Sequence, residues 1–279
     1  MTTETMQLAS DALAGRTVVV TGASSGIGRA VAERLGGLGA HVWLAGRDRA
    51  PMDASAEAIV AAGGQADVRS VDLRQVAAVQ GLVEEAHGTT GRFDIMVNNA
   101  GLGYGSSILE GHPEQWREMF EVNVIALLVG CQAAVRAMRM AGLPGHIVNI
   151  SSTAALLRDS GVYGATKHAV NCISASLREE LEDDPIRVVN IMPGVIATNF
   201  ARNLDPEMVA GVVRAAGLDV AIAPGDKLPD EVNASLHERM RTMVGHPDDV
   251  ARAVVFAVTQ PPELNIEQVV VRPAKRLPL

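Results

Sequence analysis

Short β-branched runs alternate with longer segments of helical periodicity over most of the chain. Runs such as VVV, IVNI and VVNIM are continuously apolar, which is typical of strands covered on both faces. Because strands joined by helices pair in parallel, this pattern predicts an α/β fold, a doubly wound parallel sheet with helices on both faces. Seven strands are predicted, at residues 17–21, 41–45, 68–72, 93–98, 146–151, 186–192 and 268–272.

A glycine-rich turn, T-G-A-S-S-G-I-G, directly follows the first predicted strand. Glycines permit a tight turn and let a diphosphate reach backbone N–H groups at a helix N-terminus, where the helix dipole favours negative charge. After a buried strand and before a helix, the turn favours a dinucleotide site in a Rossmann-type fold over a merely structural turn. The predicted contacts are Gly22, Ser24, Ser25, Gly26, Ile27 and Gly28.

The residues after the second strand bear on which dinucleotide binds. Gly46 and Arg47 stand where a cofactor without a 2′-phosphate usually meets an acidic residue. An arginine can pair bidentately with that phosphate, whereas a carboxylate would repel it. NADP(H) is therefore predicted in preference to NAD(H). The alternative leaves Arg47 as a solvated charge and makes Asp48 the partner of the ribose.

Asp72, at the end of the third predicted strand, has two interpretations. Its carboxylate can accept a hydrogen bond from an adenine amino group, with Leu73 beside it, or it can cap the next helix. Asp72 and Leu73 are therefore candidate cofactor contacts, with the helix cap left open as the other role.

Tyr163 and Lys167 are four residues apart at the start of an amphipathic stretch, so both side chains should leave one face of a helix. An ammonium group near a phenol favours the phenolate, so Lys167 is expected to lower the pKa of Tyr163 toward a value useful for proton transfer. The same spacing also fits a buried tyrosine followed by a solvent-facing lysine.

One segment departs from the short connections between elements. Residues 199–245 separate the sixth predicted strand from the last helix, and they combine scattered Pro and Gly with helical patterns. Long insertions in compact domains are commonly functional, so an ordered lid is predicted here and is called the lid segment below. The chain length fits one domain at 15–279, which includes the lid segment, after an N-terminal tail at 1–14.

Composition argues against several functions. A net charge of -8 and a pI near 5.4 disfavour nucleic acid as a partner, because such a surface repels a polyanion. Cys131 and Cys172 lack C-x-x-C spacing, which indicates a reducing cytoplasm rather than a disulfide framework. The seven histidines have no metal-ligand spacing, so no metal is predicted. Neither a signal peptide nor a membrane span is expected.

Six motifs in order resemble the classical short-chain dehydrogenase/reductase family: TGASSGIG, NNAG at 98–101, Asn123 in FEVNV, the serines of VNISS, YGATK, and PGVIAT at 193–198. The resemblance implies that NNAG stabilises the central strand and that NNAG and PGVIAT bind the nicotinamide half of a cofactor. The implied contacts are Asn99, Ala100, Gly101, Pro193, Gly194, Val195 and Thr198, together with Tyr163 and Lys167.

The resemblance also implies a catalytic tetrad. Tyr163 would exchange a proton with the substrate oxygen during hydride transfer, while Lys167 lowers the tyrosine pKa and holds the nicotinamide ribose. Ser152 would hydrogen-bond the reacting oxygen, and Asn123 would hold a water that relays protons. Ser152 precedes Tyr163 by 11 residues, a shorter spacing than is usual in the family. Ser151 is the alternative, although the second serine of NISS matches the family pattern.

The resemblance implies an NADP(H)-dependent dehydrogenase or carbonyl reductase of EC 1.1.1 class that acts on a small hydroxy acid, aldehyde or ketone. The C-terminal stretch is similar to the branch of NADP-dependent serine and 3-hydroxy acid dehydrogenases and related aldehyde reductases. Arg158 or Arg214 could bind a substrate carboxylate, and Tyr104 could shape the pocket rim or pack a loop. A catalytically silent NADP(H) sensor and an epimerase or dehydratase with retained cofactor remain alternatives. Helix pairing at 113–140 and 163–183, as in similar proteins, predicts a homotetramer or homodimer.

Overall fold

A parallel sheet forms the centre of the molecule. The computed structural model describes residues 12–105, 107–204, 206–220, 223, 225–261 and 263–277. Within them, seven strands lie in the order β3-β2-β1-β4-β5-β6-β7. Their bounds are β1 Thr17–Thr21, β2 His41–Gly46, β3 Gln65–Ser70, β4 Ile95–Asn98, β5 Gly145–Ile150, β6 Ile186–Pro193 and β7 Gln268–Val271. The order reverses between β1 and β4, as in a doubly wound sheet, so the predicted Rossmann-type α/β fold is confirmed.

β3 is shifted from its predicted position. The strand spans Gln65–Ser70, whereas the sequence pattern predicts residues 68–72. β3 is an edge strand in which only Val68 is buried, so no continuous apolar run marks it. Asp72 consequently lies in the loop beyond the strand rather than at its end.

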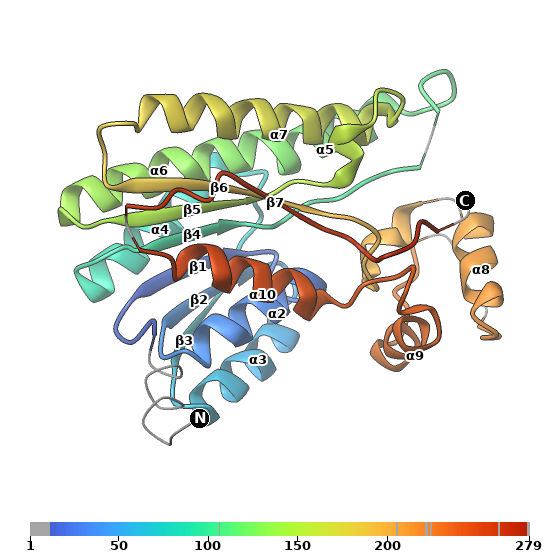
Figure 1. Ribbon diagram of the computed structural model, residues 1–279, viewed down its shortest axis with the longest axis horizontal. Helices are drawn as coiled ribbons and strands as arrows, with labels where there is room; N and C mark the ends of the chain where they lie inside the picture. Colours follow the sequence, from blue (N-terminus) through green and yellow to red (C-terminus); the bar gives the residue numbers. More distant parts are fainter. Residues whose placement is uncertain are drawn as a thin grey trace.

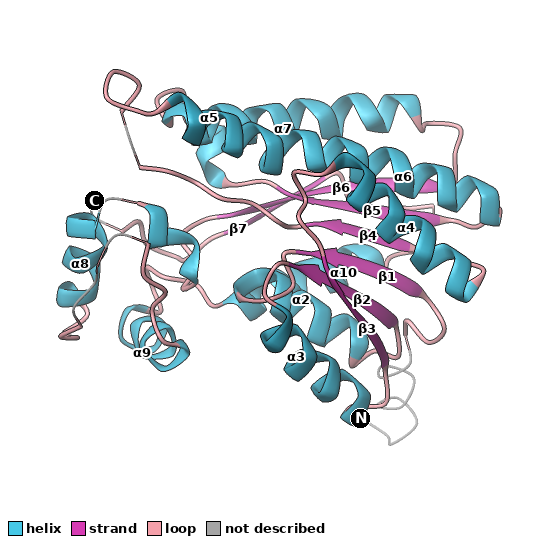
Figure 2. Cartoon of the chain, turned by 180° about the vertical axis from the view of Figure 1, so that it is seen from behind, coloured by secondary structure: helices cyan, strands magenta, loops and turns pink. Residues whose placement is uncertain are grey.

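Helices cover both faces of the sheet (Figures 1 and 2). One face carries α2 (Gly26–Gly36), α3 (Arg49–Ala61) and α10 (Pro247–Val258); the other carries α4 (Val76–Thr90), α6 (Ala126–Ala141) and α7 (Gly161–Glu180). Side chains alternate across the pleat, so Val18 and Val20 enter the hydrophobic core on the first face while Val19 enters the core on the second.

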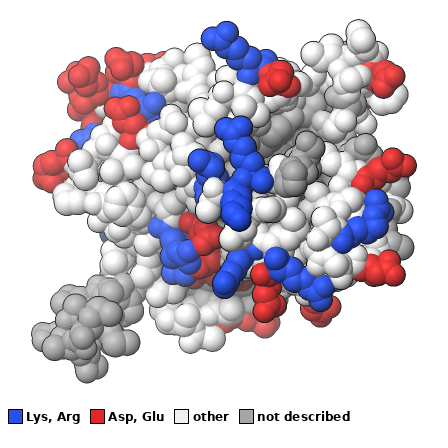
Figure 3. Space-filling view, turned by 45° about the vertical axis from the view of Figure 1, so that its right-hand side comes forward, with Lys and Arg blue, Asp and Glu red and all other residues white. Residues whose placement is uncertain are grey.

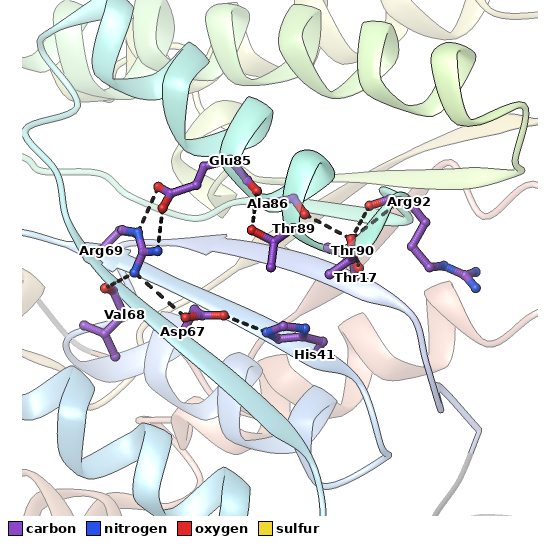
Figure 4. Close-up of polar contacts among 10 residues, drawn as sticks. All are labelled: Thr17, His41, Asp67, Val68, Arg69, Glu85, Ala86, Thr89, Thr90 and Arg92. Carbon is purple, nitrogen blue, oxygen red and sulfur yellow. Dashed lines mark hydrogen bonds and ion pairs between the residues drawn. The ribbon is translucent and has the colours of Figure 1, made fainter.

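The β3 edge is fastened to α4 by polar side chains (Figure 4). Arg69 of β3 pairs with Glu85 of α4, with 2.5 Å between Nη2 and Oε1, and its guanidinium lies 4.8 Å from the centre of the Trp43 ring. His41 Nε2 is 2.8 Å from Asp67 Oδ2 on the neighbouring strand. These contacts hold the exposed β3 edge of the sheet in place.

A π-helical turn interrupts the helix predicted at 113–140. The structure has α5 (Pro113–Phe120), the turn η1 (Glu121–Ile125) and then α6. By length and composition, Pro113–Ala141 would be long and apolar enough to cross a membrane. An 18-residue window within it has a mean hydropathy of 1.5, and 56% of that window is buried in the fold. A largely buried helix of this kind is also typical of the core of a globular α/β protein.

The lid segment contains the short helix η3 (Asn199–Asn203), α8 (Pro206–Ala215) and α9 (Asp230–Met240). Figures 1 and 2 place α8 and α9 together to one side of the sheet, beyond the carboxyl ends of its strands. The Lys275 N–H donates to the Thr242 carbonyl (2.8 Å), which ties the chain after β7 to the lid segment. Residues 1–11 of the predicted N-terminal tail lie outside the described residues, whereas Leu13 packs into the core with 1% of its surface exposed.

Candidate active site

The carboxyl ends of the parallel strands border a cleft with a volume of about 720 Å³. Its lining includes many of the predicted cofactor-binding residues: Gly22, Ser24, Ser25, Gly26, Ile27, Arg47, Asp72, Leu73, Asn99, Ala100, Gly101, Tyr163, Lys167, Pro193, Gly194, Val195 and Thr198. Gly28, Asn123 and Ser152 are not among the residues that line it. The structure thus brings most of the predicted set to one place, at the edge where open α/β sheets bind ligands.

The glycine turn has a conformation that only glycine fits well. Gly22 has a φ of +68°, and a Cβ there would lie 2.9 Å from the Ala100 Cα. A Cβ at Gly28 would lie 2.3 Å from the Gly22 carbonyl oxygen, so Gly28 lets α2 start directly behind the turn. The N-cap residue Ser25 makes no side-chain capping hydrogen bond, and the first turn of α2 carries no acidic residue. The positive end of the α2 dipole is therefore available to an anion in the cleft.

Thr21 and Asn99 join the ends of β1 and β4. Asn99 Nδ2 donates to the Thr21 carbonyl (2.8 Å), and the Asn99 and Ala100 N–H groups donate to Thr21 Oγ1 (3.1 and 3.2 Å). These bonds hold NNAG against the glycine turn, as the resemblance implied for the central strand. Thr21 was not among the predicted site residues, because its hydroxyl acts across strands that are far apart in sequence.

Tyr163 and Lys167 stand on the first turns of α7, next to the strand end of β5. Lys167 is only 4% exposed, and its Nζ donates to the Ile150 carbonyl (2.9 Å). The same Nζ lies 5.9 Å from the centre of the Tyr163 ring. The solvent-facing alternative for the lysine is therefore wrong, and both polar side chains line the cleft.

Burial controls the protonation of this pair. It raises the pKa of Tyr163 to about 12, against a smaller lowering by the Ser152 hydrogen bond, and it lowers the pKa of Lys167 to about 8. The sequence-based expectation was a lowered tyrosine pKa. The cost of burying a phenolate thus sets the pKa of Tyr163, and Lys167 is not among the causes of its shift. At neutral pH the Tyr163 phenol is thus protonated.

The two adjacent serines have different partners. Ser151 is buried, and its Oγ donates to Asn171 Oδ1 (2.6 Å). Ser152 Oγ accepts from the Ala154 N–H (3.1 Å) at the start of the short helix η2 (Thr153–Leu156), and it hydrogen-bonds Tyr163. Ser152 is therefore the serine linked to the phenol, in spite of the shortened connection, whereas Ser151 is the one among the residues that line the cleft.

Asn123 lies in the π-helical turn η1 and is 1% exposed. Its Oδ1 accepts from the Leu102 N–H (2.9 Å), while Nδ2 donates to the Leu102 carbonyl (2.8 Å) and to Thr166 Oγ1 (3.0 Å). The side chain thereby fixes the loop after β4 to α7. Single π-turns occur often at functional sites, and this one separates α5 from α6.

Three asparagines lie in register across β4, β5 and β6: Asn98, Asn149 and Asn190. Asn98 Nδ2 donates to Asn149 Oδ1 (2.9 Å), and Asn149 Nδ2 donates to Ser174 Oγ of α7 (3.0 Å). Asn190 Nδ2 donates to Asn171 Oδ1, also on α7 (2.8 Å). This row positions the helix that carries Tyr163 and Lys167. Sequence reasoning missed it, although buried Asn within two apolar strands was a readable signal.

Charged side chains surround the other end of the cleft. Arg47 is exposed and lines it, and the neighbouring Asp48 pairs with Lys227 of the lid segment at 2.5 Å. Asp72 accepts from the Arg74 N–H (3.1 Å) and from its guanidinium, which lowers the pKa of Asp72 to about 2. Asp72 therefore does not cap α4. Figure 3 shows basic side chains gathered near the centre of one face, with acidic side chains among them.

The candidate substrate residues are spread apart. Tyr104 donates to Glu118 Oε2 (2.5 Å), so it ties its loop to α5. Arg158 and Arg214 are exposed and do not line the cleft. Phe200 of η3 packs on Tyr163, with ring centres 5.2 Å apart. A Cβ at Gly103 would lie 2.9 Å from Phe200 Cζ, so Gly103 leaves room for that ring.

Comparison with known proteins agrees with this architecture. An uncharacterized oxidoreductase of Methylorubrum extorquens is 39% identical over 247 residues, which cover 88% of this chain and 90% of that protein. A metagenomic short-chain oxidoreductase in complex with NADP has a TM-score of 0.73 at 31% identity, covering 95% of this chain and all of that one. A short chain dehydrogenase/reductase of Burkholderia phymatum in complex with NAD has a TM-score of 0.74 at 27% identity, covering 92% and 89% of the two chains.

The sequence model of the short chain dehydrogenase family matches residues 16–209, which is more than half of the chain and contains the glycine turn, NNAG and the Tyr163–Lys167 pair. The sheet order, the cleft at the strand ends and the relatives all agree with that match. The chain belongs to the short-chain dehydrogenase family of oxidoreductases.

Proposed function

We propose that this protein transfers hydride between NADP(H) and the carbonyl or alcohol carbon of a small substrate, with Tyr163 as the acid–base. The observation that carries the proposal is the pair of Tyr163 and Lys167 in a cleft that Arg47 also lines, with Ser152 hydrogen-bonded to Tyr163. The cleft fits a dinucleotide, because Gly22 and Gly26 let the turn lie close against its neighbours, where their Cβ atoms would be 2.9 Å from Ala100 Cα and 3.0 Å from Thr198 Cγ2, and leave the N-terminus of α2 open to a diphosphate.

Tyr163 is the group that moves a proton. Since its pKa is raised to about 12, the phenol is protonated at neutral pH and can donate to the oxygen of a carbonyl substrate during reduction. Ser152, which is hydrogen-bonded to Tyr163, would hold the same oxygen and stabilise its developing charge. The bound nicotinamide would supply the hydride in reduction or accept it in oxidation.

Lys167 and Asn123 support this centre. The Lys167 ammonium group would bind the nicotinamide ribose and, by its charge, favour the phenolate that forms after proton transfer. The Asn123 side chain is engaged by Leu102 and Thr166, so a relay water at this position would bind the main chain of the π-turn. In this arrangement the whole proton path lies between η1 and α7.

The substrate end of the cleft is largely apolar. Leu102, Val195, Phe200 and Leu204 line the cleft, while Arg158 and Arg214 do not. Arg202 also lines the cleft, but it lies close enough to Asp48 to lower the pKa of that carboxyl. An uncharged aldehyde or ketone therefore fits better than a hydroxy acid, whose carboxylate would need a cationic partner near Tyr163.

The deciding experiment is turnover on a panel of aldehydes, ketones and β-hydroxy acids with NADP(H) and with NAD(H). The expected result is steady reduction of an aldehyde or ketone at a higher kcat/KM with NADPH. Arg47→Asp should reverse that preference, because a carboxylate repels the 2′-phosphate. Binding of nucleotide without turnover on the whole panel would instead identify a sensor.

We also infer a homo-oligomer in the cytoplasm. Phe120, Ile125 and Leu128 of the α5–α6 region are each more than 40% exposed, which gives this helical stretch an apolar outer face suited to a second subunit. Light scattering coupled to size exclusion should give a mass two or four times that of the chain.

A further inference from the structure

We propose that Lys227 of the lid segment binds the 2′-phosphate of NADP(H), so that the lid segment takes part in selecting the cofactor. This rests on the proposed function. It adds a specificity residue that lies 180 positions after Arg47 in the sequence and was not predicted from it.

The first support is where Lys227 lies. Its Nζ is 2.5 Å from Asp48 Oδ2, and both residues line the same cleft as Arg47. Asp48 follows Arg47 directly at the end of β2, where the ribose of the adenosine half lies in this fold. Lys227 therefore reaches from the lid segment to the position at which a 2′-phosphate would enter.

The second support is the charge around Asp48. Lys227, Arg47 and Arg202 all hold the pKa of this carboxyl below its usual range, Lys227 most strongly. Three cations thus surround one exposed carboxylate: Arg47 directly after β2, and Arg202 and Lys227 of the lid segment. A phosphate monoester carries about -1.5 to -2 charges and three acceptor oxygens, so it would compete with Asp48 for the same cations.

The third support is that the lid segment is already fastened on either side of Lys227. Arg29 Nη1 of α2 lies 2.8 Å from Asp230 Oδ2 at the start of α9, and the Gly105 N–H donates to the Asn203 carbonyl (3.4 Å). The backbone near Lys227 is thereby held at the cleft, and a rotation of the flexible lysine side chain is enough to exchange Asp48 for a phosphate. The present Lys227–Asp48 pair, 56% and 51% exposed, contributes little to folding.

Because the chain has few lysines, protection of Lys227 by a bound nucleotide can be measured directly by chemical labelling. The chain has three, Lys167, Lys227 and Lys275, of which Lys167 is buried and Lys275 is exposed outside the cleft. Acetylation by an amine-reactive ester is followed residue by residue by mass spectrometry. Saturating NADP⁺ should slow acetylation of Lys227 by about fivefold or more, and NAD⁺ by less than about twofold, with Lys275 unchanged as the control. Equal protection of Lys227 by the two nucleotides, or protection by neither, would overturn the proposal.

Affinities separate this inference from the proposed function. Lys227→Met should weaken NADPH binding by about tenfold, the effect of losing one charge-assisted contact, and leave NADH within about twofold. Lys227→Arg should retain the preference, and Lys275→Met should match the wild type. Asp48→Asn should tighten NADPH, because it frees Lys227 and removes a like charge.

Nucleotide fluorescence titrations of these variants give three readings. A wild type without preference for NADPH would contradict the cofactor assignment itself. A wild type that prefers NADPH, with Lys227→Met equal to it for both nucleotides, would leave that assignment to Arg47 and refute the role of Lys227. A selective loss of NADPH affinity in Lys227→Met alone supports it.

Discussion

Two buried titratable groups lie at opposite ends of the same sheet. Lys167, 4% exposed, stands beside the carboxyl end of β5; His146, 8% exposed, is the second residue of β5 at its amino end. Burial is the largest cause of the shift in both, and it lowers the pKa of Lys167 to about 8 and that of His146 to about 4.

Their surroundings differ. Lys167 lines the cleft with Tyr163, and its ammonium group donates to a strand-end carbonyl. His146 lies between Ile95 and Arg187 in the sheet register, and its Nδ1 is buried without a hydrogen-bond partner among the described residues. A shifted pKa therefore marks a functional group only where a cleft and reactive neighbours coincide with it. At the amino end of β5, the burial of His146 lowers its pKa in the same way but only costs stability.

The largest expected effect tests the carboxyl end. Tyr163→Phe removes the proton that reduction requires, so kcat should fall by about 10³-fold while the NADPH dissociation constant changes by less than about threefold. Steady-state kinetics and fluorescence titration measure the two quantities. His146→Gln is the matched control, and its kcat at pH 7 should stay within about threefold of wild type. Comparable turnover in Tyr163→Phe would contradict the assignment.

The adjacent serines sharpen the comparison within one strand end. Ser152→Ala should lower kcat by about 10²-fold, because the developing oxyanion loses a donor. Ser151→Ala should instead lower the free energy of unfolding by about 1 kcal/mol, through its lost bond to Asn171, and leave kcat nearly unchanged. Kinetics and urea unfolding of both variants decide the matter, and the reverse pattern would make Ser151 the catalytic serine.

His146, at the amino end of β5, should make the free energy of unfolding depend on pH in the acid range. Because burial lowers the pKa of folded His146 from 6.5 to about 4, the unfolded chain binds a proton below pH 6.5 that the folded chain does not. Stability is therefore lost as the pH falls, by about 2 kcal/mol between pH 7 and pH 5 from this residue. Urea unfolding at several pH values should show a shallower pH dependence in His146→Gln; parallel curves would refute the buried neutral histidine.

The smallest expected effect is at the rim of the cleft, where the pKa of Asp72 is shifted by hydrogen bonds and not by burial. Arg74→Gln should return the pKa of Asp72 from about 2 toward 3.8, because the Arg74 hydrogen bonds are the main cause of the lowering. A carboxyl titration by NMR measures it. An unchanged pKa would mean that Asp72 is held by a partner other than Arg74.

Much of the architecture could be read from the sequence because buried parallel strands are continuously apolar. β1, β5 and β6 have that character, and their predicted bounds agree with the structure to within one residue at each end. β3 does not, since one buried valine in an edge strand leaves no pattern to detect. The π-turn at Asn123 was not predicted for a related reason: the helical periodicity of the sequence is almost the same with or without one extra residue in the turn.

The site residues likewise fall into those that a local sequence pattern predicts and those that only the folded chain brings together. The glycine turn and the Tyr163–Lys167 pair are local patterns, so they were predictable. The pKa of Tyr163 was predicted in the wrong direction, because sequence spacing reveals a charged neighbour but not the loss of water around the phenol. Thr21, Asn171 and Lys227 act across long sequence separations, and only the folded chain brings them to their partners.

The row of asparagines across β4, β5 and β6 also bears on how the chain reaches this fold. Docking α7 one turn out of place would bury the Asn149 and Asn190 amides without Ser174 and Asn171, and each unpaired amide costs about 1–3 kcal/mol. An apolar surface alone would tolerate such a slip. The polar row thus favours the one docking position of α7 that brings Tyr163 and Lys167 to the cleft.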